Sequence, residues 1–493
     1  MAATPVFIGL DVEDAFNPEA DDALKRLCEV HTDVGVPLNL FVAGQKARVL
    51  RRNCRHDVIA ALGEHEICYH GNYWFDYPEP AMLYGARDDW DTALAKAYTI
   101  EIEGLNEVAQ VTGRFPAAYV QHQGNHSPVT QYAVRQAGVM VNNGGFGDDM
   151  PHNAWVMDTL FVGRASRNVG YQGDWSQMWN PLKPERQKPA VDPDVQLRNF
   201  QEAFDRQLEK GHDHVNILGH PTCWHFAEWW GWYDFILPFR QTEEKGGPGP
   251  FPHDRLWRKP VQRTQADIDA HFEWTRRAAE WLAGRDDVQV MKLSDYYEQH
   301  REPAGQWLSI EQVRDMARRL TESFDALKVG ETTVSAADAL VLLATLGEHV
   351  IHYNKLPRKL QIRRTIGPAE PVPEIDEPMT FPREEYLMAA RGIYSYVMTH
   401  GRIPHEVKTH RINCGPAQAL MALAQAFSGD ELPDEVTVAP VSGLPEAANL
   451  PVFKNAKANS TNAPPFYEDR LGKRMNMLCK LQSWSYRPLV KNA

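Results

Sequence analysis

Two acidic side chains stand two positions apart near the start of the chain, in the segment IGLDVEDAF. Alternate residues of a β-strand project from the same face, so the carboxylates of Asp11 and Glu13 are expected to lie together at a strand end. The carboxyl ends of parallel strands form the active face of barrel enzymes, where a general base or a ligand of a hard cation is placed. The motif alone leaves open that these acids only cap the following helix.

Two histidines end other apolar segments of the chain. His70 closes HEICYH, and His220 closes VNILGH, where Pro221 restricts the backbone of the histidine before it. Imidazole titrates near neutral pH and binds zinc-type ions, so His70 is a candidate metal ligand and His220 a candidate proton donor. For each histidine the alternative is a hydrogen-bonded structural role in the core.

An aromatic run follows His220, and its members are Trp224, His225, Trp229, Trp230, Trp232 and Tyr233. Flat rings beside an active site commonly stack on sugar faces, so Trp224 is a candidate substrate-binding residue. Packing of a loop, or contact with another subunit in a homo-oligomer, would explain the same run equally well.

Short apolar segments alternate with amphipathic helical stretches from Pro5 to about Tyr297. This alternation is typical of an α/β fold with a parallel sheet, and about seven strands predict a distorted (β/α) barrel. Two segments rich in Gly, Pro, Trp and Tyr, roughly 147–193 and 221–262, predict loops over one end of that barrel.

The pattern after Pro303 is helical only, and two segments there are weakly similar. The first begins LSIEQVRDMARRL and the second FPREEYLMAARGI, and each is too small to bury its own apolar face. A proline-rich linker over 366–378 lies between them. We therefore expect a barrel over 1–302, a smaller all-α accessory domain over 303–430 and an irregular tail over 431–493.

Composition restricts the partners and the location of the protein. The 493 residues carry a formal net charge of −13, which repels phosphate backbones and anionic lipid surfaces, so neither nucleic acid nor a membrane is an expected partner. The six cysteines form no CxxC pair, which indicates reduced thiols. The chain opens on an apolar strand without the features of a signal peptide, which predicts a cytoplasmic location.

The segments around Asp11, His70 and His220 together resemble the polysaccharide deacetylase (NodB-homology) family over nearly the whole of residues 5–297. IGLDVEDAF is similar to the first motif of that family, with Asp-x-Glu-Asp in place of adjacent aspartates. GEHEICYHGNYW is similar to the histidine motif, and NILGHP to the final leucine-histidine motif. The resemblance implies a barrel hydrolase that cleaves the amide bond of an N-acetylated sugar or a related small amide.

Roles for single residues follow from the same resemblance. Asp11 would be the general base that activates water, and His220 would be the general acid. Glu13 or Asp14, together with His70, would bind a divalent metal, with zinc as the expected ion. Such an ion polarises the amide carbonyl and stabilises the tetrahedral oxyanion of the reaction.

Two departures from the family pattern bear on this metal. The family has a second histidine four residues after the first, and Trp74 stands there instead. Val120 and His122 occupy the places of the arginine motif of the family. We assign His122 to substrate binding, and the alternative is that His122 or His126 supplies the missing nitrogen ligand.

Two further segments carry looser resemblances. Asp174 and Trp175 in GYQGDWSQMW resemble the aspartate-tryptophan element that orients the acidic partner in this family, so we expect both near the substrate. EYLMAARGIYSYVMTHGRIPHEV resembles the pseudomurein-binding type of repeat, which implies contact with a glycan or peptide of the cell-wall kind. The alternative is a helical accessory domain that packs on the barrel or forms a dimer.

Three functions remain open from the sequence. The first is a metal-assisted deacetylase of a carbohydrate or small amide. The second is a metal-independent, allantoinase-like amidohydrolase, which Trp74 favours because it removes a metal ligand. The third is a non-catalytic barrel that binds glycan or serves in assembly, and the presence of both Asp11 and His220 argues against it.

Overall fold

The computed structural model divides the chain into two compact units. Unit 1 consists of residues 1–152, 162–299 and 457–473, and unit 2 of residues 153–161, 300–456 and 474–493. The structure describes residues 3–73, 88–121, 127–146, 150, 152–163, 169–170, 191–228, 259–303, 305–454 and 469–489.

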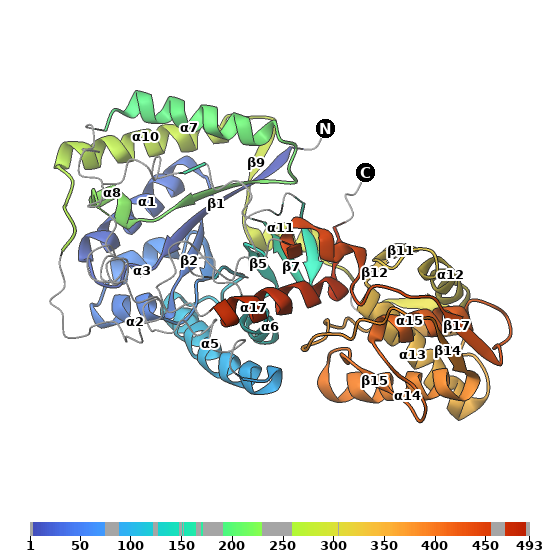
Figure 1. Cartoon of the computed structure of the whole chain (residues 1–493). Helices are drawn as coiled ribbons and strands as arrows, with labels where there is room; N and C mark the ends of the chain where they lie inside the picture. Colours follow the sequence, from blue (N-terminus) through green and yellow to red (C-terminus); the bar gives the residue numbers. More distant parts are fainter. Residues whose placement is uncertain are drawn as a thin grey trace. The chain divides into compact units, whose positions relative to one another are not determined.

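Unit 1 is built on a parallel sheet with β1 (Thr4–Val12) in its middle. On one side lie β2 (Asn39–Val42), β3 (Glu66–Tyr69), β4 (Ala118–Tyr119) and β5 (Val141–Asn143), in that order. On the other side β1 pairs with β8 (Val215–Gly219) and β9 (Val288–Val290). The sheet is curled into a half-barrel (Figure 1), so the predicted α/β fold with about seven parallel strands is confirmed.

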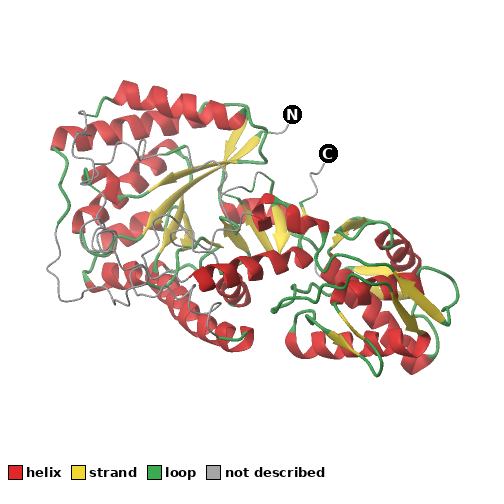
Figure 2. Cartoon of the chain, viewed as in Figure 1, coloured by secondary structure: helices red, strands yellow, loops and turns green. Residues whose placement is uncertain are grey.

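Helices follow these strands, as parallel connections require. They are α1 (Pro18–Val34), α2 (Gly44–Arg52), α3 (His56–Leu62), α5 (Trp90–Thr112), α6 (Pro128–Gln136), α7 (Pro193–Leu208), α8 (Thr222–His225), α10 (Gln265–Ala283) and α11 (Leu293–His300). Figure 2 shows the strands in yellow with red helices around them. The pair α7 and α10 packs together, and α1 packs on α8 and α10.

Local sequence explains where the first helix begins and ends. Pro18 stands at its first position, and Glu19 and Asp21 lie in the first turn, where carboxylates interact favourably with the helix dipole. Gly35 ends the helix in the left-handed conformation, with φ of 75°, which costs a glycine little. The helix buries Leu24 and Leu27 against the sheet core.

Unit 2 contains the same arrangement twice. In the first copy α12 (Ile310–Leu320) and α13 (Ala336–Tyr353) flank the hairpin of β11 (Leu327–Val329) and β12 (Thr332–Val334), and β10 (Trp307–Ser309) pairs with β13 (Lys359–Gln361). In the second copy α14 (Arg383–His400) and α15 (Pro416–Phe427) flank the hairpin of β15 (Val407–Lys408) and β16 (Asn413–Cys414), and β14 (Met379–Pro382) pairs with β17 (Glu435–Val438). The weak duplication in the sequence is therefore a structural repeat.

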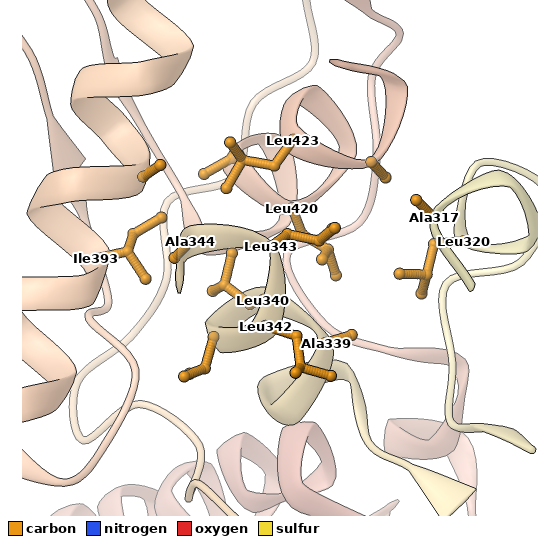
Figure 3. Close-up of a cluster of buried hydrophobic side chains, with 14 of the residues drawn as sticks. Ala317, Leu320, Ala339, Leu340, Leu342, Leu343, Ala344, Ile393, Leu420 and Leu423 are labelled. Atoms are coloured by element: carbon orange, nitrogen blue, oxygen red, sulfur yellow. The ribbon is translucent and has the colours of Figure 1, made fainter. Parts of the chain in front are cut away.

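The core of unit 2 forms around α13, which is buried on almost all sides. Figure 3 shows Leu340 and Leu343 of this helix between Ile393 of α14 and Leu420 and Leu423 of α15. A helix that is apolar all round belongs at the centre of a domain. The unit is mainly helical, and its short antiparallel strand pairs are an addition to the all-α domain that the sequence predicts.

The prediction of an irregular tail over 431–493 is wrong for much of the described part of this region. Besides β17, this region contains η4 (Glu446–Asn449), α16 (Pro451–Lys454), α17 (Asp469–Leu481), η5 (Gln482–Ser485) and β18 (Arg487–Pro488). Within unit 2, β18 pairs with β6 (Ala154–Val156), and the Trp484 side chain is fully buried in the core. The proline and asparagine residues of this region favour loops, but Trp484 of η5 packs in the core of unit 2 and holds the segment around it in place.

No helix in the described part of the chain is long and apolar enough to cross a bilayer.

Candidate functional site

The three predicted motifs of unit 1 end neighbouring elements of the parallel sheet. Asp11 is the next-to-last residue of β1, Glu13 directly follows that strand, and His70 and His220 directly follow β3 and β8. Parallel strands all point the same way, so their carboxyl ends meet at one edge of the sheet. The fold thus carries these four side chains to a common place.

Each of the two imidazoles lies within 4 Å of both carboxylates. His70 Nε2 is 3.2 Å from a Glu13 carboxylate oxygen and 3.6 Å from one of Asp11. His220 Nε2 is 3.5 Å from the same Asp11 oxygen and 3.8 Å from the other oxygen of Glu13. All four residues are buried, with at most 6% of their surface exposed. We name Asp11, Glu13, His70 and His220 the acid–imidazole cluster.

The orientation of His70 is set by the backbone of the next strand. Its Nδ1 lies 2.9 Å from the carbonyl oxygen of Val120, so that nitrogen is the donor and Nε2 faces the carboxylates. Burial opposes the charge on His70, but the attraction of Asp11 and Glu13 outweighs it and raises the pKa of the imidazole. Burial also raises the pKa of Glu13 to about 7, against the lowering effect of the hydrogen bond with His70.

Asp14 has a different environment from that of Glu13. Its carboxylate accepts hydrogen bonds from Asn17, both backbone and side chain, from the Phe16 backbone N–H at 3.0 Å, and from the Thr222 hydroxyl at 2.9 Å. Thr222 is two residues after His220, so Asp14 ties the loop after β1 to the turn that carries this histidine. Of the two acids considered as partners of His70, Glu13 is the one in contact with it.

Lys46 is a buried residue of this region that the sequence analysis missed. It is 2% exposed, and its Nζ donates to the Asp14 carbonyl oxygen and to the Asp21 carboxylate. A buried ammonium needs such partners because an unpaired charge is costly to remove from water. The only signal in the sequence was its place in AGQKA, directly after the second apolar strand.

Of the other predicted site residues, the structure describes only Trp224, and it does not join the cluster. Trp224 was wrong as a substrate-binding residue: its indole is fully buried, and its Nε1 donates to the Thr275 hydroxyl at 3.0 Å. A ring packed in the core offers no face to a sugar. The other residues predicted to bind substrate lie outside the described residues: His122, Asp174 and Trp175. The same holds for His126, the alternative nitrogen ligand, and for Trp74, which replaces the second histidine of the family.

The acid–imidazole cluster contains the donor types that a divalent ion binds, two carboxylates and two imidazoles. Among the described residues, however, no group of three or more His, Cys, Asp or Glu side chains is arranged to hold a metal ion. His70 and Glu13 instead contact each other directly, as a hydrogen-bonded pair does. The described donors therefore do not by themselves fit the zinc that the family resemblance implies.

Comparisons with known proteins give structural neighbours only. No family model matches the chain, and no curated protein matches it significantly. A Mycobacterium smegmatis protein assigned as a polysaccharide deacetylase is 16% identical, with a TM-score of 0.36 over 61% of this chain and 91% of that chain. An allantoinase is 14% identical, with a TM-score of 0.35 over 61% and 92%.

A third neighbour is described as a pseudoenzyme of the CE4 family from Bacillus anthracis. It is 13% identical, with a TM-score of 0.26 over 44% of this chain and 55% of that chain. At such values none of these similarities assigns an activity or a residue role to this chain. The resemblance of unit 2 to pseudomurein-binding repeats stays a prediction.

Proposed function

We propose that unit 1 is a hydrolase of carbon–nitrogen amide bonds that acts on an N-acetylated sugar or a related small amide. The observation that carries the proposal is the convergence of Asp11, Glu13, His70 and His220 at one sheet edge. Buried acids and imidazoles held together with displaced pKa values are typical of catalytic sites, because acid–base catalysis needs proton affinities near the working pH. A carbohydrate or small amide is therefore the proposed partner.

The proposed chemistry is two proton transfers around a tetrahedral intermediate. Asp11 accepts a proton from a water molecule as the water oxygen bonds to the amide carbon. The carbonyl oxygen becomes an oxyanion, and the imidazole of His70, whose raised pKa favours its charged form, stabilises it electrostatically. Collapse of the intermediate breaks the carbon–nitrogen bond while His220 gives its Nε2 proton to the departing nitrogen, so charge and atoms balance.

The steps above use no metal ion and therefore describe a metal-independent hydrolase; a hydrolase that also binds a metal ion is the other candidate. In the metal-independent version, the 3.2 Å contact between His70 and Glu13 is a hydrogen bond. Replacement of the second family histidine by Trp74 supports this version. A divalent ion, zinc first, remains the expectation of the family resemblance, and elemental analysis of the purified native protein separates the two versions.

The Asp11→Asn variant tests the proposal. We expect it to lose at least about a hundredfold in kcat on whichever N-acetylated sugar or cyclic amide the native protein hydrolyses, because an amide cannot accept the proton of water. Asp430→Asn, on a side chain that is 95% exposed in unit 2, is the matched control. Unchanged hydrolysis by Asp11→Asn would remove this residue from the mechanism.

A non-catalytic barrel is the contrasting outcome of the same assay. Native protein that binds an acetylated sugar, measured by calorimetry, but hydrolyses none of the panel would be a glycan-binding protein. That result would contradict the hydrolase proposal.

A further inference from the structure

A cavity of about 590 Å³ lies on the side of unit 1 where β1, β2 and β3 end. This volume is within the usual range for small-molecule sites. The residues that line it are Ala15, Phe16, Gln45, Arg48, Val49, Arg51, Arg52 and Tyr73. We name it the arginine cavity.

Several residues that line the arginine cavity are close in sequence to residues of the acid–imidazole cluster. Ala15 and Phe16 belong to the loop that begins with Glu13, and Tyr73 is three residues after His70. The arginines come from α2, which starts two residues after the end of β2. The cavity is therefore lined by the segments that follow β1, β2 and β3. These strands are neighbours in the sheet, with β2 between the other two.

Hydrogen bonds fix α2 against the loop after His70. The backbone N–H groups of Gly44 and Gln45 donate to the carbonyl oxygens of Gly71 and Asn72, at 3.0 and 2.8 Å. Asn72 also accepts from Arg48: the Nη1 donates to its side-chain oxygen at 2.8 Å and the Nη2 to its carbonyl oxygen at 3.4 Å. The guanidinium is thus attached to the same loop as His70.

Arg48 is held ready for a ligand. Its guanidinium lies over the Tyr73 ring, with Cζ 4.8 Å from the ring centre, and Asn72 receives two of its five N–H donors. Ordering a side chain before binding lowers the entropy that binding has to offset. Arg51, by contrast, pairs with the Glu107 carboxylate at 2.9 Å.

The lining of the arginine cavity is positively charged although the whole protein is acidic. It contains three arginines and no Asp or Glu, in a chain of formal net charge −13. Within the described part of the chain, no ion pair between a carboxylate and Arg48 or Arg52 is seen. A local concentration of one charge in a cavity attracts ligands of the opposite charge.

We propose that the arginine cavity binds an anionic group of the substrate, a carboxylate or a phosphate ester, through Arg48 and Arg52. The planar guanidinium matches both anions with paired hydrogen bonds. Phe16 and Tyr73 provide apolar walls for the ring that carries the anion. The inference deepens the proposed function and rests on it for the amide, which would lie at the acid–imidazole cluster.

Substrates that differ by one anionic group test this inference. N-Acetylglucosamine is neutral, N-acetylmuramic acid adds a carboxylate, and N-acetylglucosamine 6-phosphate adds a phosphate ester. We expect a higher kcat/KM for one of the charged sugars than for the neutral one, and which one it is distinguishes carboxylate from phosphate. Arg48→Gln and Arg52→Gln should each raise KM for that sugar by about tenfold or more, and raise KM for N-acetylglucosamine by a clearly smaller factor.

Two further variants serve as controls. Arg318→Gln makes the same change of charge on a side chain of unit 2 that is 60% exposed, and should change no KM. Arg48→Lys keeps the positive charge, and should restore part of the preference for the charged sugar. Equal effects of Arg48→Gln on charged and neutral sugars would overturn the inference.

A binding measurement separates this inference from the proposed hydrolase activity. Calorimetry with inorganic phosphate, and with lactate as the carboxylate probe, needs no turnover. We expect the native protein to bind at least one of these anions and the Arg48→Gln/Arg52→Gln double variant to lose at least about tenfold in affinity. Binding without any amide hydrolysis would reject the hydrolase and keep the anion site, whereas no difference between native and double variant would reject the anion site.

Discussion

Glu13 and His70 are two buried groups 3.2 Å apart that compete for one proton. Burial raises the pKa of Glu13 to about 7, and the neighbouring carboxylates raise the pKa of His70 above its ordinary value. Groups coupled in this way titrate as a pair and not independently of each other. In the proposed mechanism, Asp11 and His220 are the members of the cluster that accept and donate protons.

His220→Asn is the first test at the residue scale. Without a proton donor the nitrogen leaves as a far more basic group, so we expect kcat to fall by about 10²–10⁴-fold. The rate is measured on the best substrate of the amide panel. His152→Asn, on a side chain 66% exposed, is the matched control and should leave kcat unchanged.

A double variant gives a sharper result. If Asp11 and His220 act as one unit, Asp11→Asn/His220→Asn should be little slower than the slower single variant. Losses that multiply would mean that the two residues act independently, against the proposed proton transfers.

His31 on α1 makes the stability of unit 1 depend on pH. It is fully buried, and burial, with a smaller effect of His65, lowers its pKa to about 3. Below about pH 6.5, His31 becomes protonated in the unfolded chain but stays neutral in the folded chain. The free energy of unfolding therefore falls as pH decreases from about 6.5 to about 3. The contribution reaches about 1.4 kcal/mol per pH unit in this window.

His31→Gln should remove this contribution. We expect urea unfolding of unit 1 between pH 7 and pH 5 to show a shallower fall in the variant than in the native protein. His352→Gln, on a side chain 56% exposed in unit 2, is the control and should keep the native slope. Parallel curves for native protein and His31→Gln would contradict the assignment.

At the scale of elements, α2 and the loop after β3 meet through a glycine. A Cβ on Gly44 would lie 2.5 Å from the Asn72 side-chain oxygen and 3.0 Å from the Gly104 Cα of α5. No side chain fits there without movement of the backbone around it. The close approach lets Asn72 hold Arg48, so one glycine links the packing of α2 to the arginine cavity.

Gly44→Ala should therefore affect stability and anion binding together. We expect a loss of about 1–3 kcal/mol in the free energy of unfolding from overpacking, and weaker phosphate binding because Asn72 moves away from Arg48. Gly392→Ala, at a helical glycine with nothing within 4 Å of the added Cβ, is the control and should not destabilise. An unchanged affinity for phosphate in Gly44→Ala would show that the position of Asn72 does not affect anion binding.

At the scale of the whole molecule, the C-terminal residues complete the fold of unit 2. Arg487 is almost fully buried, and its guanidinium contacts the carboxylates of Glu302 and Asp158. Arg364 shares this region, at 2.7 Å from Glu302 and 2.8 Å from Asp338. Arg487 is 185 residues from Glu302 and 329 residues from Asp158 along the chain, so the C-terminal segment closes a network that begins near residue 158.

Arg487→Met should destabilise unit 2. The Asp158 and Glu302 side chains are 36% and 24% exposed, and Glu302 keeps Arg364 as a partner, so we expect the lost contacts to cost about 1–3 kcal/mol. Thermal unfolding followed by circular dichroism measures the effect, with Arg411→Met as control because that side chain is 72% exposed and pairs only loosely with Glu384. Equal melting temperatures for the two variants would contradict a structural role for the C-terminal segment.

The sequence by itself determined which helices and strands form, and that Asp11, His70 and His220 lie at strand ends. Apolar segments that end in Asp11, His70 and His220 predict parallel strands with these residues at their carboxyl ends, and one edge then collects them. Helix starts such as Ser335, whose side chain accepts from the backbone N–H of Asp338, are equally local signals. Such properties depend on neighbours within a few residues, so a single chain reveals them.

Only the tertiary structure decided which side chains face one another. In the folded chain Glu13 contacts His70, and Asp14 accepts a hydrogen bond from Thr222. Trp224 is buried in the core, and Lys46 pairs with Asp21. The tertiary structure also ordered the C-terminal tail around Trp484 and paired the outer strands of each repeat in unit 2. These outcomes depend on contacts between residues far apart in the chain, where packing and desolvation outweigh the local preferences that a sequence displays.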